Sequence, residues 1–367
     1  MAQVKGLRSR SPSYKRKVGQ LLSSMGICYQ VVGMSSGDTI IRKLVKSVKP
    51  VDFFIDEILR PRRPEVLYEA SRHLVMAGGK RLRPFLVLKS CEAVGGDPRN
   101  AIPFAAAFEI LHNFTLVHDD VMDNDAMRRG APTVHTKWGV PMAIAAGDLL
   151  FAKVFEAMTT YSPEGMSAKH VKECVEIVSA ATIELCEGQV LDISFPNTID
   201  VTEEDYFTMV QGKTGALFRA CAEVGSIVGG GKKRQVKALG NFAWDAGIAF
   251  QLMDDYLGAT ADAKTLGKPV GSDLREGKKT LIILHALRKA KPRQKERILA
   301  ILGNSTATKQ QIEQTNILLK EIGSIDYTLK RADKYITSAK KHINTLPNTE
   351  AKNDLLALIN YFTNRQY

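Results

Sequence analysis

Paired aspartates occur twice in the 367-residue sequence, and each pair closes an apolar stretch with helical spacing. The first pair is Asp119 and Asp120, followed by Asp123. On a helix, Asp119 and Asp123 project from one face, about 6 Å apart along the axis. Like charges so placed destabilise a helix, and a hard divalent cation such as magnesium would offset that cost. Taken alone, the motif is also typical of a solvated acidic helix end.

The second pair is Asp254 and Asp255, which follow the apolar stretch that begins at Trp244. Gln251 lies three and four residues before them, so its amide shares a helical face with both carboxylates. Aspartates on the buried side of a helix are costly unless they are paired or bound to metal. Two such acidic patches in one chain are therefore less easily explained as plain helix ends.

Basic residues form several short clusters, most of them beside glycine. Arginine offers a planar fork to phosphate oxygens and lysine a compact charge, while glycine lets the backbone approach an anion closely. The pattern predicts sites for diphosphate groups, although a single basic cluster is more often plain surface. The clusters are Gly78 to Pro84, Arg128 with Arg129, Lys213 to Gly215, and Lys268 with Lys278.

Composition and charge set broad limits. A hydrophobic share of 44% with 25% charged residues is ordinary for a folded chain, and the net charge of +12 indicates anionic partners of some kind. The apolar run from Ala101 to Val117 is interrupted by polar residues, so no membrane span is expected. The five cysteines include no Cys-x-x-Cys pair, which favours a reducing compartment, and we expect a cytoplasmic protein.

The first 33 residues are basic and contain no acid. Such a segment is typical of a flexible arm, of translated sequence before a start at Met34, or of an organelle-targeting peptide, which would make the location organellar. We assign residues 1–37 to an N-terminal extension. From Asp38 onward apolar residues recur at three and four residue spacing, turns separate many helices, and no linker interrupts the pattern. Residues 38–367 are therefore predicted to form one all-α domain, with its clearest helix at residues 101–123.

Five motifs together resemble the trans-polyprenyl diphosphate synthase family, over nearly all of residues 40–360, and most closely its archaeal-type geranylgeranyl-forming members. They occur in the family's order. The motifs are GGKRLRP (Gly78 to Pro84), HNFTLVHDDVMDNDAMRRG (His112 to Gly130), GKTGALF (Gly212 to Phe218), FQLMDDYLG (Phe250 to Gly258) and LGKPVGSDLREGKKT (Leu266 to Thr280).

The resemblance implies an orthogonal helical bundle around a central cavity, the isoprenoid synthase fold. In that family an allylic diphosphate is clamped by three Mg²⁺ ions, for which Mn²⁺ can substitute. Carried over to this chain, Asp119 and Asp123 would hold two ions and Asp254 the third, with Asp120 and Asp255 in support. The diphosphate itself would be bound by Arg128, Lys213, Lys268 and Lys278.

Isopentenyl diphosphate would lie opposite, held by Lys80, Arg83, His112 and Arg129. The allylic partner, which is dimethylallyl, geranyl or farnesyl diphosphate, would ionise to a carbocation that the double bond of isopentenyl diphosphate attacks. Loss of a proton to the released diphosphate completes the longer chain. Thr214 and Gln251 resemble the groups that face the cation with their negative dipole ends. A homodimer is a further expectation from the family. No nucleic-acid partner is expected, because the basic residues accompany glycine turns and aspartates and form no continuous stripe with stacking aromatics.

The chain departs from the family in one place, because Gly258 stands where the second motif usually has a third aspartate. Since the third ion depends chiefly on Asp254, the resemblance implies retained activity with altered metal affinity or loop order. A class I terpene cyclase would need no second diphosphate site. A non-catalytic partner subunit would typically lose one aspartate motif, whereas both pairs are present here.

Product length is predicted from the residues just before the first motif. Phe114 and Thr115 precede Asp119 by five and four residues, about 6 to 7.5 Å along a helix, which is similar to one isoprene unit. An aromatic residue at the deeper position with a smaller neighbour resembles archaeal-type geranylgeranyl-forming enzymes. The predicted product is therefore the C20 geranylgeranyl diphosphate. The alternatives are C15 farnesyl diphosphate or a mixture of both.

Overall fold

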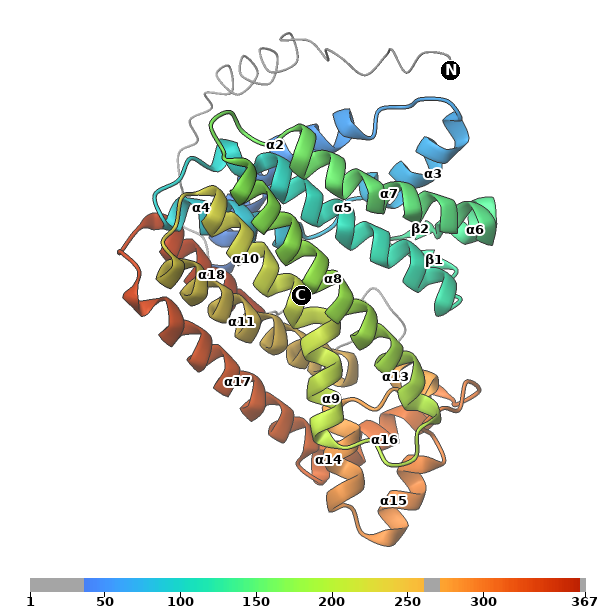
Figure 1. The fold of residues 1–367 in the computed structure, drawn as a ribbon. Helices are drawn as coiled ribbons and strands as arrows, with labels where there is room; N and C mark the ends of the chain where they lie inside the picture. Colours follow the sequence, from blue (N-terminus) through green and yellow to red (C-terminus); the bar gives the residue numbers. More distant parts are fainter. Residues whose placement is uncertain (1–35, 261–270, 364–367) are drawn as a thin grey trace.

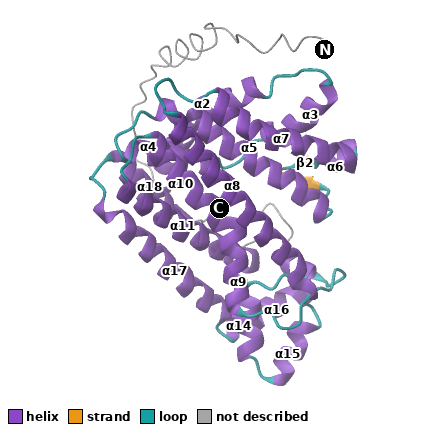
Figure 2. Cartoon of the chain, in the orientation of Figure 1, coloured by secondary structure: helices purple, strands orange, loops and turns teal. Residues whose placement is uncertain are grey.

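A computed structural model describes residues 36–260 and 271–363 of the chain (Figure 1). Nearly all of this part is helical (Figure 2), which confirms the predicted all-α class. The strands within it are β1 (Met127–Arg128) and β2 (Ala131–Pro132), which pair antiparallel. Most of the predicted extension lies outside the described residues, and α2 begins at Ser36.

The long helices cross one another in a bundle, and shorter ones gather at its lower end in Figure 1. In chain order, the helices up to the hairpin and α7 are α2 (Ser36–Ile58), α3 (Glu65–Met76), α4 (Leu82–Ala93), α5 (Pro98–Met122), α6 (Val134–Trp138) and α7 (Val140–Thr160). Next come α8 (Ala168–Ser194), η1 (Phe195–Asn197), α9 (Glu203–Val210), the π-helical η2 (Gln211–Gly215), α10 (Ala216–Val228) and α11 (Lys233–Thr260). The last are α13 (Ser272–Glu276), α14 (Leu281–Lys289), α15 (Pro292–Leu299), α16 (Lys309–Glu321), α17 (Ser324–His342), η3 (Ile343–Thr345) and α18 (Glu350–Thr363).

Helix α5 runs through the centre of the bundle. It begins slightly before the predicted residue 101, because the Asp97 side chain accepts a hydrogen bond from the Arg99 backbone at 2.9 Å and Pro98 suits the first turn. Every side chain from Phe104 to Leu111 is at most 2% exposed. A helix buried on all sides must be enclosed by others, and α2, α4, α7 and α10 all pack against it. The aspartates at its end are therefore held by a rigid support.

Glycines allow close packing where α4, α10 and α11 meet. A side-chain carbon added at Gly225 in α10 would collide with the Val87 carbonyl of α4. One added at Gly247 in α11 would lie 3.0 Å from the Phe218 side chain of α10. These contacts fix α11, and with it Asp254 and Asp255, relative to the centre of the bundle.

A second apolar cluster joins α13 to α16, at the end of the bundle away from α2. Its buried members include Leu274, Ile282, Ile298 and Ile312. The main core is separate and extends from Ile40 in α2 to Phe362 in α18. The α13–α16 cluster therefore holds α13 and the start of α14 against the end of α11.

Among the residues that the structure describes, none of the helices combines the length and the apolar character needed to cross a bilayer. This agrees with the reading of the interrupted apolar run in α5.

Candidate active site

A cavity of about 310 Å³ opens where α8, η2, α11 and α13 meet. Charged side chains of both signs line it, from these four elements and from the loop before α14. They include Asp192, Lys213, Asp254, Asp255, Asp273 and Lys278. Residues from three of the predicted motifs thus converge on one space, although they are separated by up to 65 positions from Lys213 to Lys278.

The second aspartate pair divides into an exposed and a buried member. Asp255 is 7% exposed and accepts hydrogen bonds from Tyr206 Oη at 2.6 Å and from Gln251 Nε2 at 2.9 Å. Gln251 in turn accepts one from Thr214 Oγ1 at 3.1 Å. Burial raises the pKa of Asp255 to about 7, although the Tyr206 bond opposes the shift. Asp255 thus orders Gln251 and Thr214, while Asp254 is exposed at the cavity.

The first aspartate motif lies at the carboxyl end of α5. Burial raises the pKa of Asp119 to about 6, with Lys213 opposing the rise and Asp123 adding to it. Burial also raises the pKa of Asp123, which Lys278 and Lys213 lower. Because those two lysines line the cavity, Asp123 is close to it as well. Asp119 and Asp123 therefore carry negative charge that no direct ion pair balances in the described part of the chain.

Asp120 has a different environment from its two neighbours. It is 1% exposed and forms an ion pair with Arg128, which also bonds to Asp125 at 3.2 Å. The pair fixes the loop after α5 to the helix end. Arg128, predicted to bind the allylic diphosphate, is thus held next to the first motif, and the second oxygen of Asp120, Oδ2, has no hydrogen-bond partner among the described residues.

Lys213 projects from a π-helical turn, a feature that often marks functional sites. The turn packs directly on α8, since a side-chain carbon added at Gly188 would collide with the Lys213 backbone nitrogen. Lys213 forms an ion pair with Asp192, one turn farther along α8. Lys213 therefore lines the cavity as one member of an ion pair with Asp192.

Lys278 lines the same cavity and pairs with Glu276 at 2.9 Å. Burial disfavours its charge, but Glu276 and Asp273 outweigh that effect and raise the pKa of Lys278. The side chain is thus a cation at neutral pH. Lys268, the other lysine predicted for this loop, lies outside the described residues.

The acidic side chains fit a divalent cation that completes its coordination with substrate and water. No group of three or more His, Cys, Asp or Glu side chains within residues 36–260 and 271–363 is close enough to hold a metal on its own. Magnesium, however, is commonly bound by one or two carboxylates together with phosphate oxygens and waters. Asp119, Asp123 and Asp254 supply carboxylates of that kind, and Lys213 and Lys278 lie near them for the phosphates.

A second set of basic residues lies on α4 and α5, and it includes Arg83 and His112. The Arg83 guanidinium is 5.2 Å from the Phe218 ring centre, and its Nε has no hydrogen-bond partner in the described part of the chain. Burial, together with the charges of Arg83 and Arg129, keeps the pKa of His112 well below its ordinary value, so His112 is neutral. A buried donor without a partner is unusual and suggests a ligand that supplies the acceptor.

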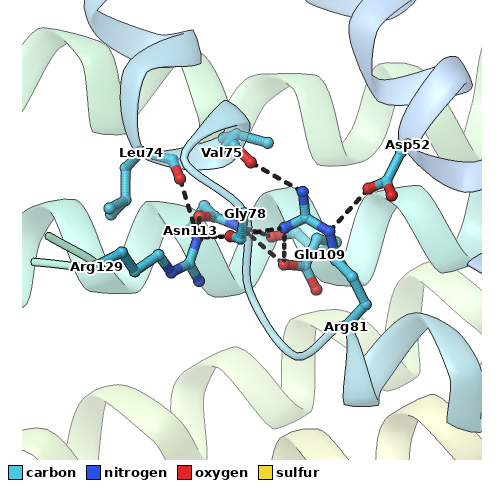
Figure 3. Close-up of polar contacts among 8 residues, drawn as sticks. All are labelled: Asp52, Leu74, Val75, Gly78, Arg81, Glu109, Asn113 and Arg129. Carbon is cyan, nitrogen blue, oxygen red and sulfur yellow. Dashed lines mark hydrogen bonds and ion pairs between the residues drawn. The ribbon is translucent and has the colours of Figure 1, made fainter. Parts of the chain in front are cut away.

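The loop between α3 and α4 is clamped by two arginines (Figure 3). Arg129 Nη1 donates to the Gly78 carbonyl, to the Leu74 carbonyl at 2.9 Å and to Asn113 Oδ1 at 3.1 Å. Gly79 permits this approach, because a side-chain carbon there would lie 2.9 Å from Arg129 Nη2. Glycine thus brings the backbone close to an arginine, whereas the sequence suggested an approach to an anion. Lys80 is exposed beside it.

Arg81 forms the other half of this clamp. Its guanidinium bonds to Asp52 at 2.8 Å, to Glu109 at 2.6 Å and to the Val75 carbonyl at 2.9 Å (Figure 3). Glu109 is 2% exposed in the middle of α5. Arg81 therefore neutralises a buried acid and ties α2, α5 and the loop together.

Replacing Arg81 with alanine should lower the free energy of unfolding by about 3 kcal/mol or more, because it leaves the Glu109 carboxylate buried without its partner. Chemical denaturation followed by circular dichroism measures the change. Arg99, whose pair with Asp97 is exposed, is the matched control, and Arg99→Ala should leave stability unaltered. An equal effect of the two substitutions would contradict the role given to Arg81.

The residues predicted to set product length sit one turn or more before Asp119. The Phe114 ring lies 5.1 Å from that of Phe151 in α7 and 4.8 Å from His118. Thr115 is 9% exposed and donates to the His112 carbonyl at 2.8 Å. Phe114 thus faces α7.

Several cavity residues were not predicted from the sequence, and they include Asp192, Tyr206 and Asp273. Asp192 interrupts an apolar run near the end of α8, which is a signal that could have been used. Asp273 lies within a quoted motif but was not selected. Tyr206 gives no local signal, since its bond to Asp255 depends on how α9 packs near α11.

Known proteins resemble this chain over most of its length. The polyprenyl synthetase family matches residues 64–318. The geranylgeranyl diphosphate synthase of Methanosarcina mazei is 42% identical, covering 90% of this chain and 99% of its own. The geranylfarnesyl diphosphate synthase of Aeropyrum pernix is 39% identical, covering 82% and 95%. The crystal structure of geranylgeranyl pyrophosphate synthetase from Pyrococcus horikoshii superposes with a TM-score of 0.86, at 45% identity, covering 90% of this chain and 100% of that one.

Proposed function

Since the chain belongs to the polyprenyl synthetase family and is a prenyltransferase, we propose that it condenses isopentenyl diphosphate with an allylic diphosphate at this cavity. The observation that carries the proposal is the meeting of Asp254, Lys213 and Lys278 in one cavity, with Asp119 and Asp123 beside it. Acids and lysines together suit a diphosphate bound through divalent cations.

The allylic substrate is assigned to this acidic side of the site. Asp119 and Asp123 would hold two Mg²⁺ ions and Asp254 a third, and Mn²⁺ would serve in their place. When bound, the ions stabilise charge that develops on the departing diphosphate. Lys213 exchanges its pairing with Asp192 for the phosphate, and Arg128 and Lys278 add further positive charge. Thr214 and Gln251, ordered by Asp255, face the allylic carbons with oxygen atoms and so stabilise positive charge there.

Isopentenyl diphosphate is assigned to the opposite, basic side. The Nε of Arg83 offers a donor that has no partner in the described structure, and neutral His112 can donate without adding charge. Arg129 and Lys80 complete the set from the clamped loop. Because the two diphosphates bind to separate groups, the carbon atoms that react can meet between them.

The decisive experiment is incubation with magnesium, isopentenyl diphosphate and each of the C5, C10 and C15 allylic diphosphates, followed by chromatography of the dephosphorylated products. Prenyl chains longer than the starter are expected from at least one of them, and chelation of the metal should abolish them. Intact starter in every incubation would overturn the proposal and favour a non-catalytic subunit.

The two diphosphate sites should be separable by mutation. Arg83→Ala should raise the Michaelis constant for isopentenyl diphosphate by about tenfold or more, because it removes a charge-assisted donor. Lys213→Ala should instead lower the turnover number by about a hundredfold, because its charge acts on the departing diphosphate. Steady-state kinetics with each substrate varied in turn distinguishes the effects. If Arg83→Ala left the constant for isopentenyl diphosphate unchanged, its assignment would be wrong.

We assign geranylgeranyl diphosphate as the main product. Phe114 before the smaller Thr115 supports it, and so does the 42% identity to the M. mazei synthase. The A. pernix geranylfarnesyl diphosphate synthase, whose product would be C25, is almost as similar in sequence, at 39% identity. Family membership therefore gives the reaction, while the length of the product depends on the residues beneath the cavity.

A homodimer is the proposed assembly. Large apolar side chains are exposed on two neighbouring helices, and a second copy could cover them. They are Val140 and Ile144 in α7 and Ile183, Val190 and Ile193 in α8. Size-exclusion chromatography with light scattering should give twice the chain mass, and a monomeric mass would exclude the dimer.

A further inference from the structure

Gly258 and Asp273 are close neighbours although they lie 15 positions apart in the sequence. Gly258 is in α11, four residues after Asp254 and so on the same face. A side-chain carbon built on Gly258 would lie 2.9 Å from Asp273 Oδ2. The Asp273 carboxylate therefore occupies the space into which a side chain at position 258 would project. That position is the one at which the second motif of related enzymes usually carries its third aspartate.

We propose that Asp273 in α13 takes the place of this third aspartate and contributes to binding the divalent cation at Asp254. The inference rests on the proposed function of the cavity and adds a residue to it. Gly258 is then not a simple loss, because any side chain there would displace the carboxylate of Asp273.

The position of Asp273 is fixed by packing. Helix α13 is entered at Gly271 and left at Gly277, both of which have left-handed backbone angles, with φ of 77° and 74°. A side-chain carbon at Gly271 would collide with Ile312 in α16, and Leu274 is only 5% exposed. The single turn of helix is thus pressed against α16, and Asp273 faces the cavity from it.

Asp273 is also connected to the lysine that faces the substrate. Its carbonyl accepts a hydrogen bond from the Lys278 backbone nitrogen at 2.8 Å, which closes the turn between them. Asp254, Asp273 and Lys278 all line the cavity. An acid at position 273 therefore links the cation at α11 to the loop that carries Lys278, which an aspartate supplied by α11 itself would not do.

The test measures cation binding directly, by electron paramagnetic resonance of Mn²⁺ with inorganic diphosphate present. Asp273→Asn keeps the shape and removes the charge, and it should weaken Mn²⁺ binding by about tenfold or more, as is typical of groups that support metal ligands. Asp333→Asn, at an exposed acid of α17, is the matched control and should bind as the unmodified protein does. Binding by Asp273→Asn that equals the control would overturn the proposal.

The second part of the test moves the carboxylate from α13 to α11. In the double variant Gly258→Asp with Asp273→Ala, the acid returns to α11 and occupies the space that Asp273 leaves. It should bind Mn²⁺ within about threefold of the unmodified protein, whereas Gly258→Asn with Asp273→Ala should stay weak, since the cation needs an anionic oxygen ligand. Equal binding by the two double variants would refute the exchange, even if Asp273→Asn itself failed to fold.

Cation binding and catalysis can fail separately in this design. Product formation by the unmodified protein, with Mn²⁺ binding that ignores position 273, would reject Asp273 and leave the proposed function standing. Mn²⁺ binding that depends on Asp273, without any prenyl transfer, would support the role of Asp273 and reject the proposed function.

Discussion

Asp119→Ala should lower the turnover number on the order of a thousandfold. The carboxylate lies at the end of a fully supported helix, and its proposed ions stabilise the charge on the departing diphosphate, an effect worth several kcal/mol. Asp120 cannot replace it, because Asp120 is already paired with Arg128, and Asp123 is itself assigned to the same ions. Initial rates at saturating magnesium, with both substrates in excess, measure the loss.

The same variant should not be less stable than the unmodified protein. Burial raises the pKa of Asp119 to about 6, above the ordinary value of 3.8, so the folded state binds a proton more readily than the unfolded state does. Stability from this group is therefore greatest at low pH and is lost as the pH rises through about 6. At pH 8 without metal, removal of the ionised side chain relieves that cost. Thermal melting should then give Asp119→Ala a midpoint equal to or higher than that of the unmodified protein.

A pair of controls separates chemistry from folding. Asp333→Ala, on the exposed face of α17, should change neither the rate nor the melting temperature. Near-normal turnover by Asp119→Ala at saturating magnesium would remove the first motif from the mechanism. A low rate accompanied by early melting would instead show that the side chain supports the fold.

The sequence predicted the helices well, because helices depend on local patterns. The turn Gly95 to Pro98 and the apolar repeat after it located α5 to within three residues of its start. The spacing of Asp119 and Asp123 placed both on one helix face. Gln251 was expected to share a face with the second pair, and the structure joins it to Asp255.

What the sequence did not predict depends on contacts between distant segments. Arg81 belongs to the basic motif GGKRLRP, yet its guanidinium is used by Asp52 and Glu109, which are 29 and 28 positions away. The ion pair of Lys213 with Asp192 requires α8 and the π-helical turn to touch at Gly188. A motif thus identifies which residues are charged, but only the packing decides which charges are free to meet a ligand.

Phe114→Ser should lengthen the product beyond C20, and Thr115→Phe should shorten it towards C15. Both residues precede Asp119 on α5, about 6 to 7.5 Å from it along the axis, which is close to the length of one isoprene unit. A prenyl chain that grows away from the metals along this helix reaches Thr115 and then Phe114 as isoprene units are added. The Phe114 ring is braced by Phe151 in α7 at 5.1 Å, so it cannot easily turn aside.

Chromatography of the dephosphorylated products, with dimethylallyl diphosphate as the starter, measures the outcome. Thr115→Val is the matched control, because it keeps the size of the side chain and removes only the hydroxyl that bonds to the His112 carbonyl. It should leave the product at C20. An unchanged distribution in both Phe114→Ser and Thr115→Phe would place the floor of the tunnel on other residues.

The same experiment distinguishes a floor from a packing residue. A floor residue decides when elongation stops, and at this distance from Asp119 it does not reach the diphosphates. The rate of the first condensation, from dimethylallyl to geranyl diphosphate, should therefore stay near that of the unmodified protein while the final length changes. If Phe114 only packs against Phe151, its loss lowers the melting temperature and slows every condensation alike, and the product stays at C20. Length that changes at constant early rate is thus the signature that assigns specificity to this pair.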